Sequence, residues 1–187
     1  MGNFVKQIIS DYNFKRNYDL LNNPFVDHEV QKFSIVYFLL DKSLRFSFFV
    51  RCITCTNINI HIRRFFFHFV KIFYNCEISI GAKFGLALHF PHPNNIIIGG
   101  NAVFKNKVVI FHSVTVGKKN PGMTGGMPSF GNNIVIGSGS AILGQSNISD
   151  NIVIGANSVV TKNVPTESTV VGNNTIIQGV YFLNDYD

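Results

Sequence analysis

The chain has few cysteines, and this scarcity bears on two kinds of site. Cys52 and Cys55 form a single CxxC, and Cys76 stands alone. A CxxC without a second pair argues against zinc, and no βαβ pattern accompanies it to support a thioredoxin-like redox centre. We therefore expect three reduced structural thiols and no metal.

A long apolar run is also missing. No stretch reaches the roughly 18 residues that cross a bilayer. The best candidate is interrupted by charged residues, namely Asp41, Lys42, Arg45 and Arg51. The start, Met-Gly-Asn-Phe-Val-Lys, lacks the uninterrupted apolar core of a signal peptide. We expect a cytoplasmic protein, with the inner face of the membrane as the alternative location.

Acidic residues are too few in the first part of the chain to balance the basic ones. Residues 1–75 hold ten Lys or Arg against five Asp or Glu, whereas residues 76–187 hold six against five. The basic residues alternate with phenylalanines, most densely in Arg63-Arg-Phe-Phe-Phe-His-Phe. This basic Phe-rich segment indicates either a surface for peripheral contact with an anionic membrane or polyanionic glycan, or helices whose aromatic faces pack within the protein, which we favour. Nucleic acid is not expected, because no recognised binding motif accompanies the charge.

The abundant feature of the sequence is a six-residue repeat between Ile78 and about Thr166. Each unit is predicted to form one short strand and one turn, and three units one triangular coil whose apolar residues are covered by neighbouring coils. A helix is excluded, because the apolar spacing is six rather than a mixture of three and four. The repeated apolar residues are Ile78, Phe84, Ile98, Phe104, Ile110, Val116, Phe130, Ile136, Ile142, Ile148, Ile154 and Val160.

Composition divides the chain near Asn75. Fifteen of the 16 glycines follow residue 76, whereas 13 of the 19 phenylalanines precede it. We expect a helical segment over 1–75, a parallel β-helix over 76–179 and a tail over 180–187. The repeat is broken in 88–99, where its register slips by two, and in 118–129, a Gly- and Pro-rich insertion expected to loop out and wall a substrate cleft.

Three motifs lie in the repeat region: Gly85-Leu-Ala-Leu-His-Phe-Pro-His-Pro-Asn-Asn-Ile-Ile-Ile-Gly, Ser113-Val-Thr-Val-Gly and Ile154-Gly-Ala-Asn-Ser-Val-Val-Thr-Lys-Asn-Val-Pro. With them, roughly residues 33–172 resemble the hexapeptide-repeat acyltransferases, specifically the serine acetyltransferase-like branch that includes many bacterial polysaccharide O-acetyltransferases. The resemblance implies an all-β, left-handed parallel β-helix after a small helical segment. It also implies a homotrimer that binds acetyl-CoA, the acetyl donor, between its subunits.

The implied reaction moves an acetyl group from a thioester to a hydroxyl, and a base must take the proton of that hydroxyl. By resemblance His92 is the base, and Glu77, fifteen residues upstream where an aspartate is usual, orients it. His89 is the alternative base, and His112 is the candidate contact for the acceptor. For each histidine the alternative is a hydrogen-bonded structural role, and for Glu77 a solvated corner position.

CoA needs backbone amides along its pantetheine arm and cations near its phosphates. By resemblance, backbone amides near Gly117, Ala141 and Ala156 line the arm, and Thr161 and Lys162 lie toward the nucleotide. Lys118 and Lys119 are further candidates for the phosphates. The Gly117 N–H is the expected donor to the thioester oxyanion.

The resemblance says least about the identity of the acetyl acceptor. Serine acetyltransferases carry a second histidine just before the proline that closes the insertion, and here Met127 precedes Pro128. We therefore expect a sugar hydroxyl of a bacterial capsule or O-antigen type polysaccharide as acceptor, with Met127 in the acceptor site. Serine or another small hydroxyl compound is the alternative, and a non-catalytic scaffold is the third hypothesis.

Overall fold

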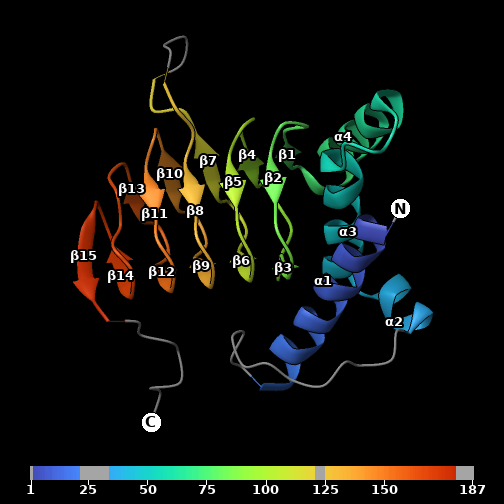
Figure 1. Cartoon of the computed structure of the whole chain (residues 1–187), viewed down its shortest axis with the longest axis horizontal. Coiled ribbons are helices and arrows are strands. Elements are labelled where there is room, and N and C mark those ends of the chain that lie inside the picture. The colour runs from blue at the N-terminus through green and yellow to red at the C-terminus, as the bar shows by residue number, and fades with distance from the viewer. Residues whose placement is uncertain (1, 22–33, 121–124, 180–187) are drawn as a thin grey trace.

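The computed structural model describes residues 2–21, 34–120 and 125–179, which form a helical part followed by a three-sided β-helix. The helices lie at one end of the β-helix, and successive coils stack from there toward β15 (Figure 1). None of the described helices is long and apolar enough to cross a membrane. The helices are α1 (Gly2–Leu21), α2 (Ile35–Leu40), α3 (Lys42–Thr54) and α4 (Ile60–Tyr74).

Each of the first four coils contributes a short strand to each of three sheets, and this is the left-handed parallel β-helix predicted above. The first sheet contains β1 (Glu77–Ile78), β4 (Ile97–Ile98), β7 (Thr115–Gly117), β10 (Ala141–Leu143) and β13 (Val159–Val160). The second contains β2 (Lys83–Phe84), β5 (Val103–Phe104), β8 (Ser129–Phe130) and β11 (Asn147–Ile148). The third contains β3 (Leu88–His89), β6 (Val108–Ile110), β9 (Ile134–Ile136), β12 (Ile152–Ile154), β14 (Ser168–Val171) and β15 (Thr175–Gln178).

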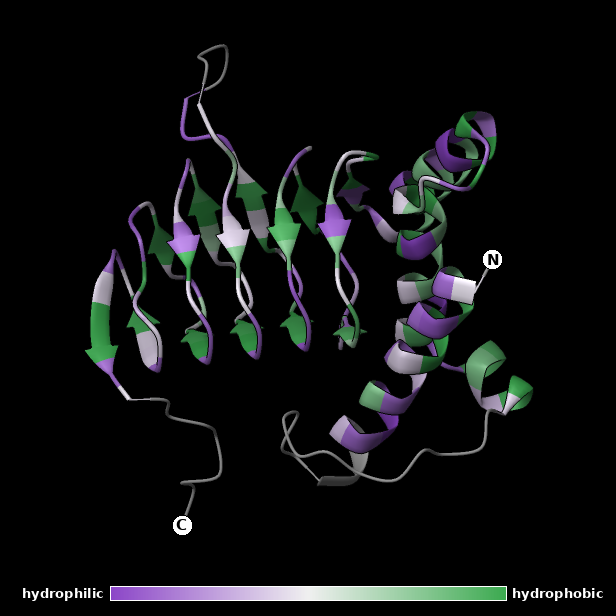
Figure 2. Ribbon diagram, viewed as in Figure 1, coloured by the Kyte–Doolittle hydropathy of each residue, from purple (hydrophilic) through white to green (hydrophobic). Residues whose placement is uncertain are grey.

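The repeated apolar residues build the interior. All twelve residues of the six-residue repeat named above are buried, and none is more than 8% exposed. Phe84, Phe104 and Phe130 stack along the second sheet, with successive ring centroids 4.8 and 4.4 Å apart. Figure 2 shows hydrophobic positions recurring from coil to coil along the strands. Stacking of equivalent residues thus covers the apolar face that a single coil leaves open.

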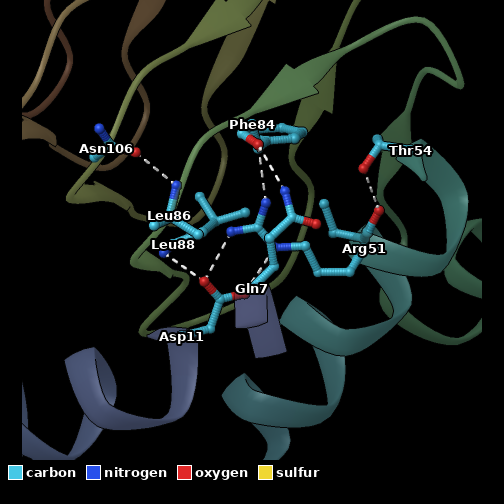
Figure 3. Close-up of polar contacts among 9 residues, drawn as sticks. Gln7, Asp11, Arg51, Thr54, Phe84, Leu86, Leu88 and Asn106 are labelled. Carbon is cyan, nitrogen blue, oxygen red and sulfur yellow. Dashed lines mark hydrogen bonds and ion pairs between the residues drawn. The ribbon is translucent and has the colours of Figure 1, made fainter. Parts of the chain in front are cut away.

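A buried ion pair fixes the helical part to the first coil. Arg51 donates through Nε and Nη2 to both carboxylate oxygens of Asp11, each at 2.8 Å. Arg51 also donates to the Phe84 carbonyl at 3.0 Å, and the Leu88 N–H donates to Asp11 at 2.8 Å (Figure 3). Burial raises the pKa of the Asp11 carboxyl, and the guanidinium opposes this increase. One polar cluster therefore joins α1, α3 and residues 84–88.

The end of the β-helix differs from the repeat. β14 and β15 pair antiparallel, with Ser168 opposite Gln178 and Val171 opposite Thr175. The connection turns through Gly172 and residues that follow it, with φ 58° at Gly172. The hairpin pairs the outer edge of β14, which a simple end of the coil would leave open. The six-residue period carries no signal for this element.

Candidate functional site

His92 lies between β3 and β4, at the corner where the first coil passes into the second. Register partners Glu77 and Ile97 are 20 residues apart, whereas Ile97 and Thr115 are 18 apart, so this corner holds two extra residues. His92 is exposed, while Phe90 before it and Ile96 after it are buried. The extra length therefore presents an imidazole to solvent on a segment anchored at both sides.

His112 occupies the same corner one coil further along. Its ring centroid lies 6.1 Å from that of His92, with the two planes at 65°. The ring centroid of Phe111 lies 6.3 Å from that of His92. Both histidines are exposed. The residues expected to act as base and as acceptor contact thus lie side by side on the outer surface.

A buried thiol supports the segment that carries His92. The Ile96 N–H donates to Cys76 Sγ at 3.3 Å, and Sγ donates to the Tyr74 carbonyl at 3.2 Å. Burial raises the pKa of this thiol, so it keeps the proton that it donates.

Cys52 and Cys55 are also free thiols. Burial raises the pKa of Cys52 to about 12, and the neighbouring Cys55 is the second cause.

Glu77 begins β1, and its N–H donates to the Ile96 carbonyl at 2.8 Å. Its carboxylate lies 2.7 Å from Lys71 Nζ, and the two side chains are 47% and 52% exposed. Within the described residues no hydrogen bond or ion pair joins Glu77 to His92. The role of Glu77 as the orienting carboxylate remains a prediction, and Lys71 is a partner that the sequence did not indicate.

His89 lies inside the protein, between β3 and the helices. It is 1% exposed, and its Nδ1 lies 3.0 Å from Ser43 Oγ. Burial, with the nearby Lys15 and His92, lowers the pKa of His89 well below its ordinary value. Its Nε2 has no hydrogen-bond partner in the described structure. An enclosed ring cannot reach an external hydroxyl, so the geometry favours His92 as the base.

Met127 comes from the end of the insertion, whose residues 121–124 lie outside the described part. It is half-buried and packs on the core of the β-helix. A β-carbon added at Gly99 would come within 2.7 Å of Met127 Cε, so the thioether covers this glycine. Gly99 directly follows β4, the strand that the His92 segment enters. The insertion therefore ends against the same coil as the candidate base.

The residues assigned to CoA follow the first sheet away from the histidines. Gly117 pairs with Leu143, and the Gly144 N–H donates to the Gly117 carbonyl at 2.9 Å. The Thr115 N–H donates to the Ser140 carbonyl at 2.9 Å. In a parallel strand every second residue directs its N–H to the same neighbouring strand. Gly117 lies two residues after Thr115, so its N–H also faces β10. We therefore do not assign the oxyanion donor to it.

The remaining candidates lie further along the coils. Ala141 pairs with both Thr115 and Val159 across the first sheet. Ala156 is exposed at the corner that follows β12, two coils beyond His112. Thr161 follows β13, and its N–H donates to Asn174 at 2.8 Å. The three lysines proposed for phosphates are all exposed, namely Lys118, Lys119 and Lys162.

Two of the hollows formed by the described residues lie against the sheets of the β-helix. One of about 380 Å³ separates α4 from the first sheet and includes Glu77, Phe67 and Gly99 in its wall. The other, of about 490 Å³, lies on the second sheet around Lys105 and Asp150, and none of the predicted site residues lines it. In the described part of the chain, no group of three or more His, Cys, Asp or Glu side chains is placed to hold a metal ion.

No protein-family model matches the chain, but individual proteins do. A serine acetyltransferase of Helicobacter pylori is 35% identical over 120 residues, which cover 61% of this chain and 70% of that protein. A serine acetyltransferase of Staphylococcus aureus is 38% identical over 102 residues, covering 54% of this chain and 48% of that protein. The chain thus spans between about half and about two thirds of these relatives.

Solved structures share the fold over almost the whole chain. Neisseria gonorrhoeae serine acetyltransferase superposes with a TM-score of 0.75 at 25% identity, covering 91% of this chain and 64% of that one. Brucella abortus serine acetyltransferase in complex with coenzyme A superposes with a TM-score of 0.79 at 22% identity, covering 97% and 70%. The second likeness bears on the fold alone.

Proposed function

This chain belongs to the serine acetyltransferase family of hexapeptide-repeat, acetyl-CoA-dependent acyltransferases, and we propose that it transfers an acetyl group to the hydroxyl of L-serine or a similarly small compound. The observation that carries the proposal is the exposed pair His92 and His112, on a fold whose similar proteins are serine acetyltransferases. The sequence alone placed a sugar hydroxyl first. The relatives favour the alternative acceptor.

We propose His92 as the general base. Its neutral imidazole takes the proton of the attacking hydroxyl while that oxygen bonds to the thioester carbonyl carbon. The carbon–sulfur bond then breaks, and the imidazolium returns the proton to the departing thiolate, so that free CoA and an acetate ester result. A positioned base contributes about 10²- to 10⁴-fold. Glu77, released from Lys71, would orient the ring and stabilise its charged form.

We place the acetyl group at the two histidines and the nucleotide toward Thr161 and Lys162. Coils stack about 4.8 Å apart, so the residues proposed for the pantetheine arm form a row that leads away from His92. Lys118 and Lys119 remain phosphate candidates beside this row. The pantetheine arm would then lie along the first sheet, on the side of the β-helix where the corner with His92 and His112 is exposed.

A second candidate acceptor is a sugar hydroxyl, and Met127 is the observation that favours it. A thioether offers no charge and only weak hydrogen bonding, so it suits the apolar face of a sugar ring better than the charged groups of an amino acid. If the enzyme uses such a glycan, Met127 is expected to contact the sugar beside His112.

The experiment that tests these proposals measures CoA release from acetyl-CoA with L-serine, other small alcohols or bacterial surface glycans as acceptor. We expect turnover on serine that falls at least about 100-fold in His92→Ala, while His89→Asn retains more activity. Turnover on a glycan but not on serine would transfer the proposal to the second acceptor. Full activity of His92→Ala would remove His92 as the base.

We further propose a homotrimer with the CoA site between subunits. The β-helix exposes apolar side chains that an oligomer would cover, among them Ile97, Val103 and Val159, which are 43%, 38% and 37% exposed. Sedimentation of the full chain should give three times the monomer mass, and a monomer that turns over acetyl-CoA would contradict this. A cytoplasmic location remains a prediction.

A further inference from the structure

Helix α4 carries three stripes of side chains, and one of them makes most of the contacts with the rest of the protein. Val70 and Tyr74 are buried, and Arg63 donates to the Ile53 and Ile80 carbonyls, both at 2.8 Å. Phe66 and Phe67 complete this packed stripe against the core. These contacts fix the rotation of the helix about its axis and so determine which residues face outward.

The second stripe is apolar and faces outward. With about 3.6 residues per turn, Ile62, Phe65, Phe69, Ile72 and Phe73 gather on one side of α4. Ile62 is 49% exposed, Phe65 63%, Ile72 75% and Phe73 68%. Phe69 lies between them and is half-buried, with its ring 4.5 Å from that of Phe73, 6.4 Å from that of Phe65 and 4.9 Å from that of Phe49 in α3, so it links the exposed stripe to the core. A continuous exposed apolar patch of this kind marks an interaction surface.

The third stripe is basic and runs beside the apolar one. It consists of His61, Arg64, His68 and Lys71, all exposed. The helix contains no aspartate or glutamate. Arg64 has no ion-pair partner in the part of the chain that the structure describes, and Lys71 is paired with Glu77 beyond the end of the helix. The outward side of α4 thus places an apolar stripe beside a stripe of basic side chains, in which Arg64 carries a charge with no ion-pair partner among the described residues.

We propose that α4 binds the surface of an anionic lipid bilayer. Its apolar stripe would enter the boundary between headgroups and acyl chains, and its basic stripe would face the lipid phosphates, as in interfacial amphipathic helices. α4 lies at the end of the molecule remote from β15, and its ribbon carries both hydrophobic and hydrophilic residues (Figures 1 and 2). A membrane plane can therefore approach it without meeting the later coils.

Two other occupants fit the observations less well. A polyanionic glycan would pair with Arg64 and Lys71 but leave the exposed apolar side chains in water. A second copy of the chain, packed through the apolar stripe about a two-fold axis with the two α4 helices antiparallel, would place two identical basic stripes on the same side of the contact. A bilayer with anionic headgroups satisfies both stripes. This inference does not depend on which acceptor the enzyme uses.

The test is flotation of the full-length protein with vesicles of phosphatidylcholine alone or of phosphatidylcholine with about 30% phosphatidylglycerol, an anionic lipid. We expect binding to the anionic vesicles that weakens as salt is added. Ile72→Ser with Phe73→Ser should reduce binding at least about 10-fold. Arg64→Glu, which lowers the net charge by two units, should reduce vesicle binding by about 30-fold at low salt.

Matched controls place the same changes on the β-helix. Ile176 and Ile177 are 38% and 39% exposed on β15, so changing both to Ser removes two partly exposed apolar side chains elsewhere on the molecule. Lys105→Glu reverses an exposed charge on the second sheet. These controls should float like the unaltered protein. Circular dichroism would verify that each variant is folded.

Four results would overturn the proposal. The first is that the folded protein fails to float with vesicles of either composition, and the second is that the α4 variants float as well as the controls. The third is a change in sedimentation of the vesicle-free protein in Ile72→Ser/Phe73→Ser without any vesicle binding, which would assign the stripe to self-association. Binding to a soluble polyanion that needs Arg64 but not Phe73, again without vesicle binding, would assign it to a glycan.

Discussion

Arg51 holds both carboxylate oxygens of Asp11 at 2.8 Å while each residue also bonds the backbone of the strand segment that leads to His92. Arg51 is 1% exposed and Asp11 3%. Bidentate geometry of this kind fixes orientation as well as distance. The pair therefore joins α1 and α3 to residues 84–88, and through them it supports the corner that presents the candidate base.

Removal of one partner should expose this dependence. Asp11→Asn leaves the Arg51 charge buried and uncompensated, so we expect a loss of about 3 to 5 kcal/mol in the free energy of unfolding. Denaturant titration followed by circular dichroism measures it. The surface pair is the matched control, since Lys71→Gln should cost at most about 1 kcal/mol. Equal unfolding midpoints for the two variants would contradict the structural role of the buried pair.

His89 predicts a pH dependence of stability. Its pKa in the folded protein lies well below the ordinary value of about 6.5, so the unfolded chain binds a proton at mildly acidic pH that the folded protein does not. Stability should thus be unaffected by His89 above about pH 6.5 and fall below it, by up to about 1.4 kcal/mol per pH unit. Lys15, Ser43 and Tyr18 enclose the ring and provide no carboxylate to stabilise its charge.

His89→Asn isolates this effect. The amide can keep the hydrogen bond to Ser43 but cannot take up a proton, so the variant should lose less stability than the unaltered protein between pH 6.5 and 5. Other acid-titrating groups, Asp11 among them, are common to both proteins and cancel in the comparison. Parallel curves for the two proteins over this range would show that His89 is not the group responsible.

The sequence predicts the β-helix well because its core is periodic. Every inward residue of the repeat is local in sequence, so Phe84, Phe104 and Phe130 can be assigned to one stacked column without any knowledge of distant contacts. Asp11 and Arg51 are 40 residues apart in the sequence. Their ion pair joins α1 to α3 beside the first coil. No local pattern indicates such a pair.

The candidate site is predictable in part for a similar reason. His92 and His112 are 20 residues apart, as are the paired residues Glu77 and Ile97. One lengthened coil therefore brings the two histidines to the same corner, and that spacing is visible in the sequence. The burial of His89 is not, because it depends on how Tyr18 and Ser43 from two helices cover β3.

Glu77 gives a prediction that separates an orienting role from a solvated corner residue. Glu77→Gln keeps the shape of the side chain but cannot stabilise an imidazolium, so kcat should fall by about 10-fold or more with little change in the KM for acetyl-CoA. Lys71→Gln removes the competing partner and should leave kcat unchanged or raise it. Steady-state CoA release at saturating acceptor measures both. If Glu77→Gln retains full kcat, the carboxylate has no part in the reaction.

Two glycines at equivalent places in the repeat should respond differently to alanine. A β-carbon at Gly137 would lie 2.6 Å from the Ala156 nitrogen and 2.8 Å from the Ile154 carbonyl oxygen, both backbone atoms of the next coil that cannot turn away. At Gly117, the nearest atom would be Leu143 Cδ2 at 3.9 Å. Gly137→Ala should therefore destabilise the fold by about 1 to 3 kcal/mol, whereas Gly117→Ala should be neutral or slightly stabilising. Thermal unfolding of the two variants under the same conditions measures the difference, and a Gly117→Ala protein that melts as early as Gly137→Ala would mean that the close approach of the coils at Gly137 does not decide the outcome.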